Sequence, residues 1–380
     1  MTQPRTPRRP SGLRWLATPD GWPWLLTPAI PLAVVFELAN ASDVAIFVSA
    51  AIGVIPPAAL MGKATEELAA RSGPGIGGLL NVTFGNFPEL IIAFFALLEG
   101  LQEVVKASII GSIVGNILLV LGASMLFGGL RTQRRRGQQT FDPIAAGAQS
   151  AMLLLAMAAL VMPAVFQLVD GGSLPHPGAE SVNFGPDVEN LSLAVAIVLI
   201  ASYAAGLLFS LRTHRDLFNP AYDVAVAGWS NRKSLSALAA AGVLVGVMSE
   251  ILVGSLENAA GSIGLSEFFI GAIIVAIVGN VAEHWIAVWV ARKDQMALSI
   301  NIAIGSSTQI ALFVAPVLVL LSFFFGDHPM PLVFNGFELA ALVLAVLIAN
   351  RVTADGRSNW FEGVQLLAVY LIVALAFGFA

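Results

Sequence analysis

The chain of 380 residues is 57% hydrophobic and only 11% charged, with a formal net charge of −5 and a mean hydropathy of +0.83. Soluble globular proteins carry about 25% charged residues, so this composition leaves too little polar surface for a soluble domain, and no nucleic-acid partner is expected. The sequence has no cysteine, which excludes disulfides, thiolate chemistry and cysteine-ligated metal sites.

Long apolar segments predict an all-α polytopic membrane protein. Residues 107–130, 144–169 and 297–326 contain no Asp, Glu, Lys or Arg. Each exceeds the roughly 20 residues that a helix needs to cross a hydrocarbon layer about 30 Å thick. Strand-like alternation is absent, so helices rather than a barrel must satisfy the backbone in lipid. In chain order, the eleven predicted membrane helices are 25–38, 44–67, 77–98, 104–128, 143–169, 188–211, 234–257, 265–291, 298–325, 331–350 and 359–379.

The first predicted helix, 25–38, is the least regular of the set, because Pro19, Pro23, Pro28 and Pro31 lie in it or just before it. No small-residue cleavage site follows it. We therefore interpret it as a retained helix and not as a signal peptide.

The basic residues predict the orientation. With the N-terminus inside and the helices alternating in direction, 18 of the 19 Lys and Arg residues fall in inside segments and only Lys106 falls outside. Basic residues accumulate on the cytoplasmic side of membrane proteins. We therefore expect a cytoplasmic N-terminus and a C-terminus on the outside. One helix more or fewer in mid-chain would destroy this asymmetry, which supports the helix count.

The sequence contains an internal repeat. Shifted by 194 residues, Gly85-Asn86-x-x-Glu89 falls on Gly279-Asn280-x-x-Glu283, and Ile110-Gly111-Ser112 falls on Ile304-Gly305-Ser306 without an insertion. An odd number of helices per copy makes the second copy enter the membrane from the opposite side, which is the inverted architecture of many secondary transporters. The predicted organisation is a cytoplasmic tail (1–24), an extra helix (25–38), a first five-helix repeat (44–211), a cytoplasmic linker (212–233) and a second five-helix repeat (234–379).

Two acidic residues lie deep within predicted helices. An ionised carboxylate inside a membrane costs at least a few kcal/mol unless it is paired, protonated or bound to a cation. Neither Glu89 nor Glu283 has a Lys or Arg within the same helical stretch; Arg292 lies more than two turns from Glu283. Cations or protons are therefore the available partners.

Helical spacing places further oxygen atoms beside each carboxylate. Gly85, Asn86 and Glu89 share one helix face, as do Gly279, Asn280 and Glu283. Gly and Pro weaken a helix, and an interruption at Pro88 would free carbonyl oxygens. Carboxylate, amide and carbonyl oxygens are hard ligands of the kind that Ca²⁺ takes.

A second motif offers neutral oxygens from the neighbouring helices. Ser112 and Asn116 are four residues apart in the helix 104–128, and Ser306 and Gln309 are three apart in 298–325. Small residues here also permit close helix packing, which is an alternative role for this motif.

These motifs resemble a known family. Gly279-Asn-Val-Ala-Glu-His284, Lys293-Asp294 and Gly305-Ser-Ser-Thr-Gln-Ile-Ala-Leu-Phe-Val314 resemble the second signature repeat of the calcium/proton exchanger family, within the cation/calcium antiporter superfamily. Gly77-Gly-Leu-Leu-Asn-Val-Thr-Phe-Gly-Asn86 and Gly111-Ser-Ile-Val-Gly-Asn116 resemble the first. The resemblance covers about residues 58–130 and 245–325.

The resemblance implies a bacterial inner-membrane antiporter, without a cofactor, that exchanges Ca²⁺ for H⁺ by alternating access. The two repeat glutamates would be the metal ligands. The ion-binding residues carried over are Glu89, Glu283, Gly85, Asn86, Gly279, Asn280, Ser112, Asn116, Ser306 and Gln309. Phe87-Pro88 and Gly115 depart from the family's pattern, which has small residues and a Ser at these places, so local geometry and ion preference could differ.

Other titratable residues are candidates for proton handling. Glu250 lies mid-helix, Glu66 and Glu67 end the helix 44–67, and His284 adjoins Glu283. Solvated helix ends remain an alternative for Glu66 and Glu67, and a local hydrogen bond remains one for His284. Glu338 lies near a span end and is expected at the membrane interface.

Three other functions remain open at this point. A sodium, potassium or monovalent-cation exchanger would use the same fold. A passive channel would conduct calcium without moving protons. An intramembrane hydrolase using Glu283 and His284 lacks a second metal-binding histidine at helical spacing. A homo-oligomer is compatible with the sequence.

Overall fold

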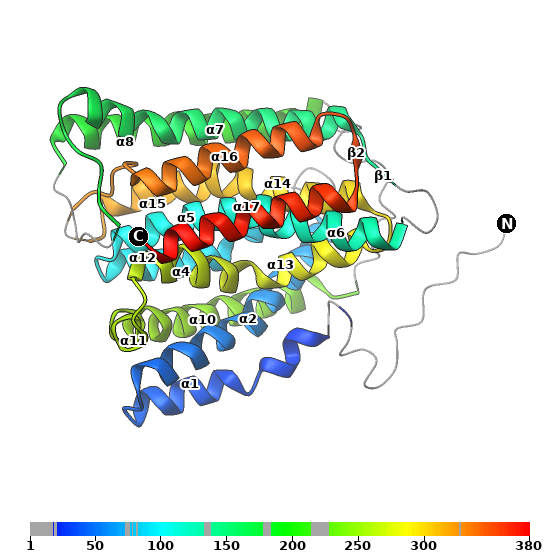
Figure 1. Ribbon diagram of the computed structural model, residues 1–380. Helices are drawn as coiled ribbons and strands as arrows, with labels where there is room; N and C mark the ends of the chain where they lie inside the picture. Colours follow the sequence, from blue (N-terminus) through cyan, green and yellow to red (C-terminus); the bar gives the residue numbers. More distant parts are fainter. Residues whose placement is uncertain are drawn as a thin grey trace.

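The computed structural model describes residues 18, 21–72, 77, 79–80, 83–132, 138–177, 184–213, 228–326 and 328–380. Most helices run side by side between the same two ends of one bundle (Figure 1). One end carries the C-terminus, and the other carries the short strands β1 (Gln139–Thr140) and β2 (Arg357–Ser358), which pair antiparallel. We call these the C-terminal end and the strand end. Most of the predicted tail 1–24 and linker 212–233 lies outside the described residues.

The described helices follow the predicted order. They are α1 (Ala29–Leu38), α2 (Asp43–Arg71), α4 (Phe87–Leu98), α5 (Gln102–Val114), α6 (Leu121–Thr132), α7 (Pro143–Val169), α8 (Pro186–Leu208), α10 (Asn231–Gly254), α11 (Leu256–Ile263), α12 (Glu267–Phe269), α13 (Ala276–Ala291), α14 (Met296–Gln309), α15 (Ala315–Ser322), α16 (Gly336–Thr353) and α17 (Trp360–Gly378). A 3₁₀ turn, Trp22–Leu26, precedes α1, as the prolines there predict. Three of the π-helical segments, η3 (Gly115–Val120), η5 (Ile270–Val275) and η6 (Ile310–Val314), join helices into longer spans.

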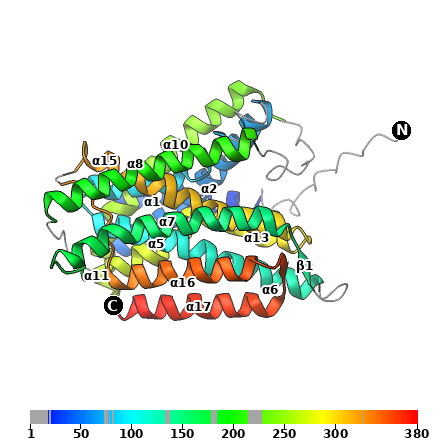
Figure 2. The ribbon, with the colours of Figure 1, turned by 90° about the horizontal axis from the view of Figure 1, so that it is seen from above.

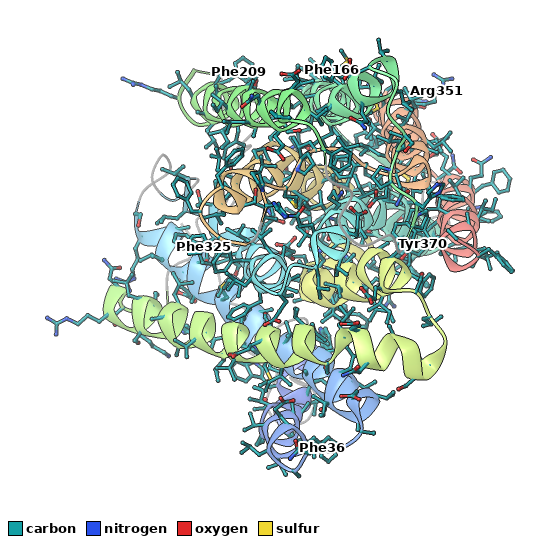
Figure 3. All side chains as sticks on the ribbon, turned by 90° about the vertical axis from the view of Figure 1, so that its left-hand side faces the viewer. Phe36, Phe166, Phe209, Phe325, Arg351 and Tyr370 are labelled. Atoms are coloured by element: carbon teal, nitrogen blue, oxygen red, sulfur yellow. The ribbon has the colours of Figure 1, made fainter. Side chains whose placement is uncertain are left out.

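The fold is that of an all-α polytopic membrane protein, as predicted. Within the described residues, nine helices are long and apolar enough to cross a membrane, and two shorter apolar helices, Trp22–Leu38 and Phe87–Leu98, occupy the other predicted positions. Large apolar side chains cover the periphery: Ile144 and Ile372 are each 65% exposed. Figure 3 shows Phe36, Phe166 and Phe209 at the outer edge of the bundle. Such a surface is stable against lipid tails and not against water.

Two groups of helices lie along different sides of the bundle. Helices α1, α2 and α10 pack together along the lower side in Figure 1, although α10 lies far from α1 and α2 in sequence. Helices α16 and α17 line another edge, which is clearest in Figure 2. There α17 packs on α6 through Gly122 and Gly363; a Cβ added at Gly363 would lie 2.4 Å from the Leu126 amide nitrogen. Small residues thus allow the close helix approach that packing in lipid requires.

The repeat is visible in the backbone. Helix α5 starts at Gln102 and α14 starts at Met296, which is the same offset of 194 residues that relates the sequence motifs, and each leads through a π-helical segment into a further helix. The two starts lie at opposite ends of the bundle. The Gln102 side chain donates to the His328 carbonyl at the C-terminal end, whereas Asp294, just before α14, accepts from Gln139 of β1. The two copies therefore run in opposite directions, as predicted.

Local chemistry corrects several predicted boundaries. The predicted helix 77–98 is interrupted at Asn86. The helix predicted over 234–257 stops at Gly254 and resumes as α11 after Ser255. The helix predicted from 331 begins at Gly336, because Asn335 and Glu338 form a capping box that fixes its first turn.

Candidate functional site

Glu89 lies in the first turn of α4, directly after a break in the chain's helical path. Asn86 is in a turn with φ −101° and ψ 25°, and Pro88 occupies the first helical turn, where a missing amide hydrogen costs nothing. The interruption that the sequence predicts here is therefore present. It places the Glu89 carboxylate near the positive end of a helix dipole. Of the motif that leads into it, Gly78, Asn81 and Val82 lie outside the described residues.

The second copy presents its carboxylate differently. Gly279, Asn280 and Glu283 all lie within α13, which runs unbroken as α-helix from Ala276 to Ala291. The irregular backbone lies before it, in η5. The first copy has Pro88 where the second has Ala282, so only the first copy carries a residue that stops the helix.

The two copies cross so that the glycine of each faces the carboxylate of the other. A Cβ built on Gly279 would lie 3.3 Å from Glu89 Cγ and 3.6 Å from its Oε1. A Cβ built on Gly85 would lie 3.8 Å from Glu283 Oε1 and 3.8 Å from Gln309 Oε1. The glycines thus leave room for the two carboxylates where the repeats meet.

The two motif asparagines, Asn86 and Asn280, are held by hydrogen bonds from their amide nitrogens. Asn86 Nδ2 donates to Gln309 Oε1 at 2.5 Å. Asn280 Nδ2 donates to Ser112 Oγ at 3.2 Å and to the Ala276 carbonyl at 3.0 Å. Among the described residues, three buried oxygens of this site have no hydrogen-bond partner: Asn86 Oδ1, Asn280 Oδ1 and Glu89 Oε2. Buried oxygens of this kind are normally satisfied, so a ligand or a proton is expected there.

The second motif supports the carboxylates from the adjacent helices. Ser306 Oγ donates to Glu283 Oε2 at 2.7 Å. Asn116 Oδ1 lies 3.1 Å from His284 Nε2, so this amide oxygen contacts the histidine. The contact between Asn116 and His284 could not be predicted from the sequence, because the two residues belong to opposite copies of the repeat.

Within the described part of the chain, neither Glu89 nor Glu283 forms an ion pair with Lys or Arg. When both are ionised, the charge of Glu283 acts unfavourably on that of Glu89. No group of three or more His, Cys, Asp and Glu side chains gathers among the described residues. The arrangement is therefore a pair of carboxylates with neutral oxygens, which suits a hard cation or protons.

The other acidic residues that were predicted to handle protons differ in their exposure and contacts. Glu66 is half exposed and contacts Lys63 at 3.2 Å. Glu67 is buried, and its Oε2 accepts a hydrogen bond from the Trp229 amide at 3.0 Å. It therefore anchors the residues that immediately precede α10. Glu250 is exposed on α10, beside the buried Ser249.

Glu338 corrects a sequence expectation. It was expected at the interface, but its side chain is fully buried at the N-terminus of α16. A buried Lys106 acts on it electrostatically. The pattern Asn335-Gly-Phe-Glu338 carries the capping-box spacing that could have located it.

Comparisons with known proteins cover nearly the whole chain. The family model described as sodium/calcium exchanger protein matches residues 42–212 and 233–379. A Ca²⁺/H⁺ antiporter of Synechocystis sp. is 45% identical over 371 residues, covering 92% of this chain and 95% of that protein. The Ca²⁺/H⁺ antiporter ChaA of Bacillus subtilis is 43% identical over 359 residues, covering 93% and 97%. The solved structure of native YfkE, at 41% identity, superposes with a TM-score of 0.78 over 94% of this chain and 100% of that one.

Proposed function

This chain belongs to the sodium/calcium exchanger protein family, and from that premise we propose that it exchanges Ca²⁺ for H⁺. It is an integral membrane transporter and not an enzyme. Relatives at 43–45% identity carry the name Ca²⁺/H⁺ antiporter. Identity at this level over more than nine-tenths of the chain supports the same exchange here.

The proposed ion site lies where the two copies of the repeat meet. Glu89 and Glu283 would bind one Ca²⁺ when deprotonated, and Asn86 Oδ1 and Asn280 Oδ1 would supply neutral ligands. The observation that carries this proposal is the pair of half-buried carboxylates, which has no basic partner among the described residues and is bordered by buried oxygens that lack hydrogen bonds. Ca²⁺ takes six to eight oxygen ligands, so backbone carbonyls and water would complete the shell.

Electroneutrality links calcium to protons at this site. Two carboxylates with one Ca²⁺ are neutral, and so are two protonated carboxyls. The empty dianion would place two like charges together in a low dielectric, which is strongly disfavoured. The site therefore changes its access only when it carries Ca²⁺ or protons, which is the requirement for antiport. Inverted repeats allow such a site to open alternately to either side.

Two rival functions receive less support. An exchanger for sodium or potassium on the same fold would need ligands for additional monovalent cations; the relatives from Synechocystis and Bacillus subtilis are both named as Ca²⁺/H⁺ antiporters. An intramembrane hydrolase would use Glu283 with His284, but His284 Nε2 contacts Asn116, and no cluster of three metal-ligating side chains lies among the described residues.

We place the protein in a bacterial plasma membrane with the strand end inside. The basic residues carry this assignment, because 18 of the 19 Lys and Arg then lie on the cytoplasmic side. The similar proteins of Synechocystis and Bacillus subtilis support a bacterial setting. The two repeat domains would be 44–211 and 234–379, which nearly coincide with the two segments that the family model matches.

The proposed exchange is tested with purified protein in liposomes. A Ca²⁺-sensitive dye and a pH-sensitive dye are followed together while Na⁺, K⁺ and Mg²⁺ are exchanged in turn for choline. Ca²⁺ addition on one side should move protons the opposite way without Na⁺ or K⁺. Ca²⁺ flux that moves no protons would indicate a channel, and a requirement for Na⁺ or K⁺ would indicate the rival exchanger.

The hydroxyl of Ser306 provides a graded test of the site. Ser306→Ala removes the hydrogen bond to Glu283 Oε2, which stabilises the deprotonated carboxylate. Because a hydrogen bond to a charged group contributes about 1.5–3 kcal/mol, we expect about a tenfold weaker apparent Ca²⁺ affinity, more so at acidic pH where protons compete. Ser307→Ala is the matched control, because its hydroxyl donates to the Ala303 carbonyl at 2.9 Å and not to a carboxylate. Equal Ca²⁺ affinities in the two variants would remove Ser306 from the site.

A further inference from the structure

A second group of buried charges lies at the C-terminal end, away from the strand end. Lys106 of α5 is only 1% exposed and is ion-paired with Glu103 one turn earlier. Its Nζ also donates to the Val333 carbonyl at 3.1 Å and lies 5.8 Å from the centre of the Phe184 ring. Glu338, which is 0% exposed, is subject to the charges of both Lys106 and Glu103. Charged residues inside a membrane protein are costly, so a function is the first interpretation.

Only one of the two carboxylate oxygens of Glu338 has a role in the fold. Its Oε2 accepts from the Asn335 amide at 2.8 Å, which completes the capping box of α16. Its Oε1 is buried and has no hydrogen-bond partner in the part of the chain that the structure describes. Helix capping therefore accounts for one oxygen of this carboxyl group and leaves the other unexplained.

The charges of Glu103, Lys106 and Glu338 do not balance when all three groups are ionised. Glu103 is ion-paired with Lys106, and Glu338 lies within the range of the charges of both. If all three were ionised, an uncompensated negative charge would lie in a nearly dry environment, which is strongly unfavourable. One proton shared by the two carboxyl groups makes the cluster neutral. Glu103 is 14% exposed, so it gives this proton contact with the C-terminal side.

The elements around the cluster add few other charges. Helix α8, whose start adjoins Phe184, carries Asp187 and Glu189 in its first turn, exposed and half-buried respectively. Helix α7, which packs along α16, has no charged residue. Helix α17 and strand β2 also contact α16, but Glu362 and Arg357 lie at the strand end. Within the described residues, the charges that act on Glu338 are those of α5.

We propose that Glu338 is a further proton-binding residue of the exchanger, which takes up and releases a proton on the C-terminal side while Lys106 balances its charge. In the release step, the O–H bond of the Glu338 carboxyl breaks, the proton passes by way of Glu103 to water, and the positive charge of Lys106 stabilises the carboxylate that is left. Lys106 lies six residues before Ser112 on α5, about 9 Å along the helix, so the cluster is near the candidate ion site without belonging to it. This inference rests on the proposed Ca²⁺/H⁺ exchange.

A matched pair of variants tests the proposal. Glu338→Gln preserves an oxygen for the capping box and removes the titratable group. Glu362→Gln is the control, because Asn359 and Glu362 form the same capping box at the start of α17, at the strand end. Wild type and both variants are compared in liposomes for Ca²⁺-driven proton movement and for Ca²⁺/Ca²⁺ exchange, which needs no net proton transfer.

For Glu338→Gln we expect proton movement to fall by at least about tenfold, because a positioned proton-transfer group contributes that much or more. Its dependence on pH at the C-terminal side should be lost, while Ca²⁺/Ca²⁺ exchange should match wild type. Glu362→Gln should behave as wild type in both assays. A Glu338→Gln variant that transports like Glu362→Gln, or one that loses both activities alike, would overturn the proposal.

Glu103→Gln keeps the test decisive if Glu338→Gln does not fold. It leaves Lys106 and Glu338 as a neutral pair that no longer holds the extra proton, so the same loss of pH dependence is expected. Unchanged pH dependence in Glu103→Gln would refute the shared proton. Failure of wild-type protein to couple Ca²⁺ to protons would instead contradict the proposed function, so the two failures are distinguishable.

Discussion

Replacing either Glu89 or Glu283 by Gln should abolish Ca²⁺-driven proton movement in liposomes. Each variant leaves one carboxylate to face a divalent cation, and the loaded site then carries an uncompensated positive charge in a low dielectric. Removing one partner from a buried charge pair costs about 3–5 kcal/mol, which is roughly 100-fold or more in affinity. Ca²⁺ binding by isothermal calorimetry and the two-dye transport assay would measure both effects.

The carboxylate of Glu99 provides the control. It lies exposed directly after the last residue of α4, the helix whose first turn contains Glu89. Glu99→Gln changes the net charge by the same amount and should leave transport close to wild type. Persistent proton coupling in either Glu89→Gln or Glu283→Gln, with Glu99→Gln unaffected, would rule out the glutamate pair as the shared site.

Lipid explains why the helix plan could be predicted from the sequence. A segment that crosses a membrane must be apolar and helical over a fixed length, so hydropathy alone locates it to within a few residues. The π-helical segments could not be predicted in this way, because a π-helix and an α-helix expose the same apolar side chains to lipid. Nor does hydropathy show that α10 ends at Gly254, because the residues on both sides of that break are suited to a helix.

The candidate site was predictable for a different reason. Glu89 and Glu283 stand out because acidic residues are rare within spanning helices and because the repeat places them at equivalent positions. Their spatial proximity follows from inversion, which the odd number of helices requires. The sequence does not reveal which oxygens are free. That depends on contacts between the copies, such as Asn86 with Gln309 and Asn280 with Ser112.

The burial of Glu338 could not be predicted from the sequence. Near the end of a hydrophobic span, a glutamate is usually at the interface, and only its neighbours in space decide otherwise. Lys106 comes from a helix more than 200 residues earlier in the chain. Its burial against Val333 and Phe184 is a tertiary fact with no local pattern in the sequence.

The repeat predicts that equivalent glycines of the two copies have similar surroundings, but the structure shows a difference at one such pair. Gly111 and Gly305 occupy the same place in the Ile-Gly-Ser motif of the two copies. A Cβ on Gly111 would lie 1.9 Å from the carbonyl oxygen of Ala272 and 2.6 Å from its carbonyl carbon, both in the backbone of η5. A Cβ on Gly305 would meet nothing closer than the Asn301 side chain at 3.8 Å. Helix α5 therefore approaches η5 through Gly111, while Gly305 has space.

Gly111→Ala should consequently destabilise the protein, and Gly305→Ala should not. Alanine favours a helix over glycine by about 1 kcal/mol at both positions. At Gly111 this gain is outweighed, because overpacking costs about 1–3 kcal/mol or more and a backbone atom cannot move aside as a flexible side chain does. Thermal unfolding in detergent, followed by the fluorescence of the seven tryptophans, should show a lower midpoint for Gly111→Ala and an equal or higher one for Gly305→Ala. Equal midpoints would mean that α5 and η5 are not in close backbone contact, and the crossing that positions Ser112 against Asn280 would lose its support.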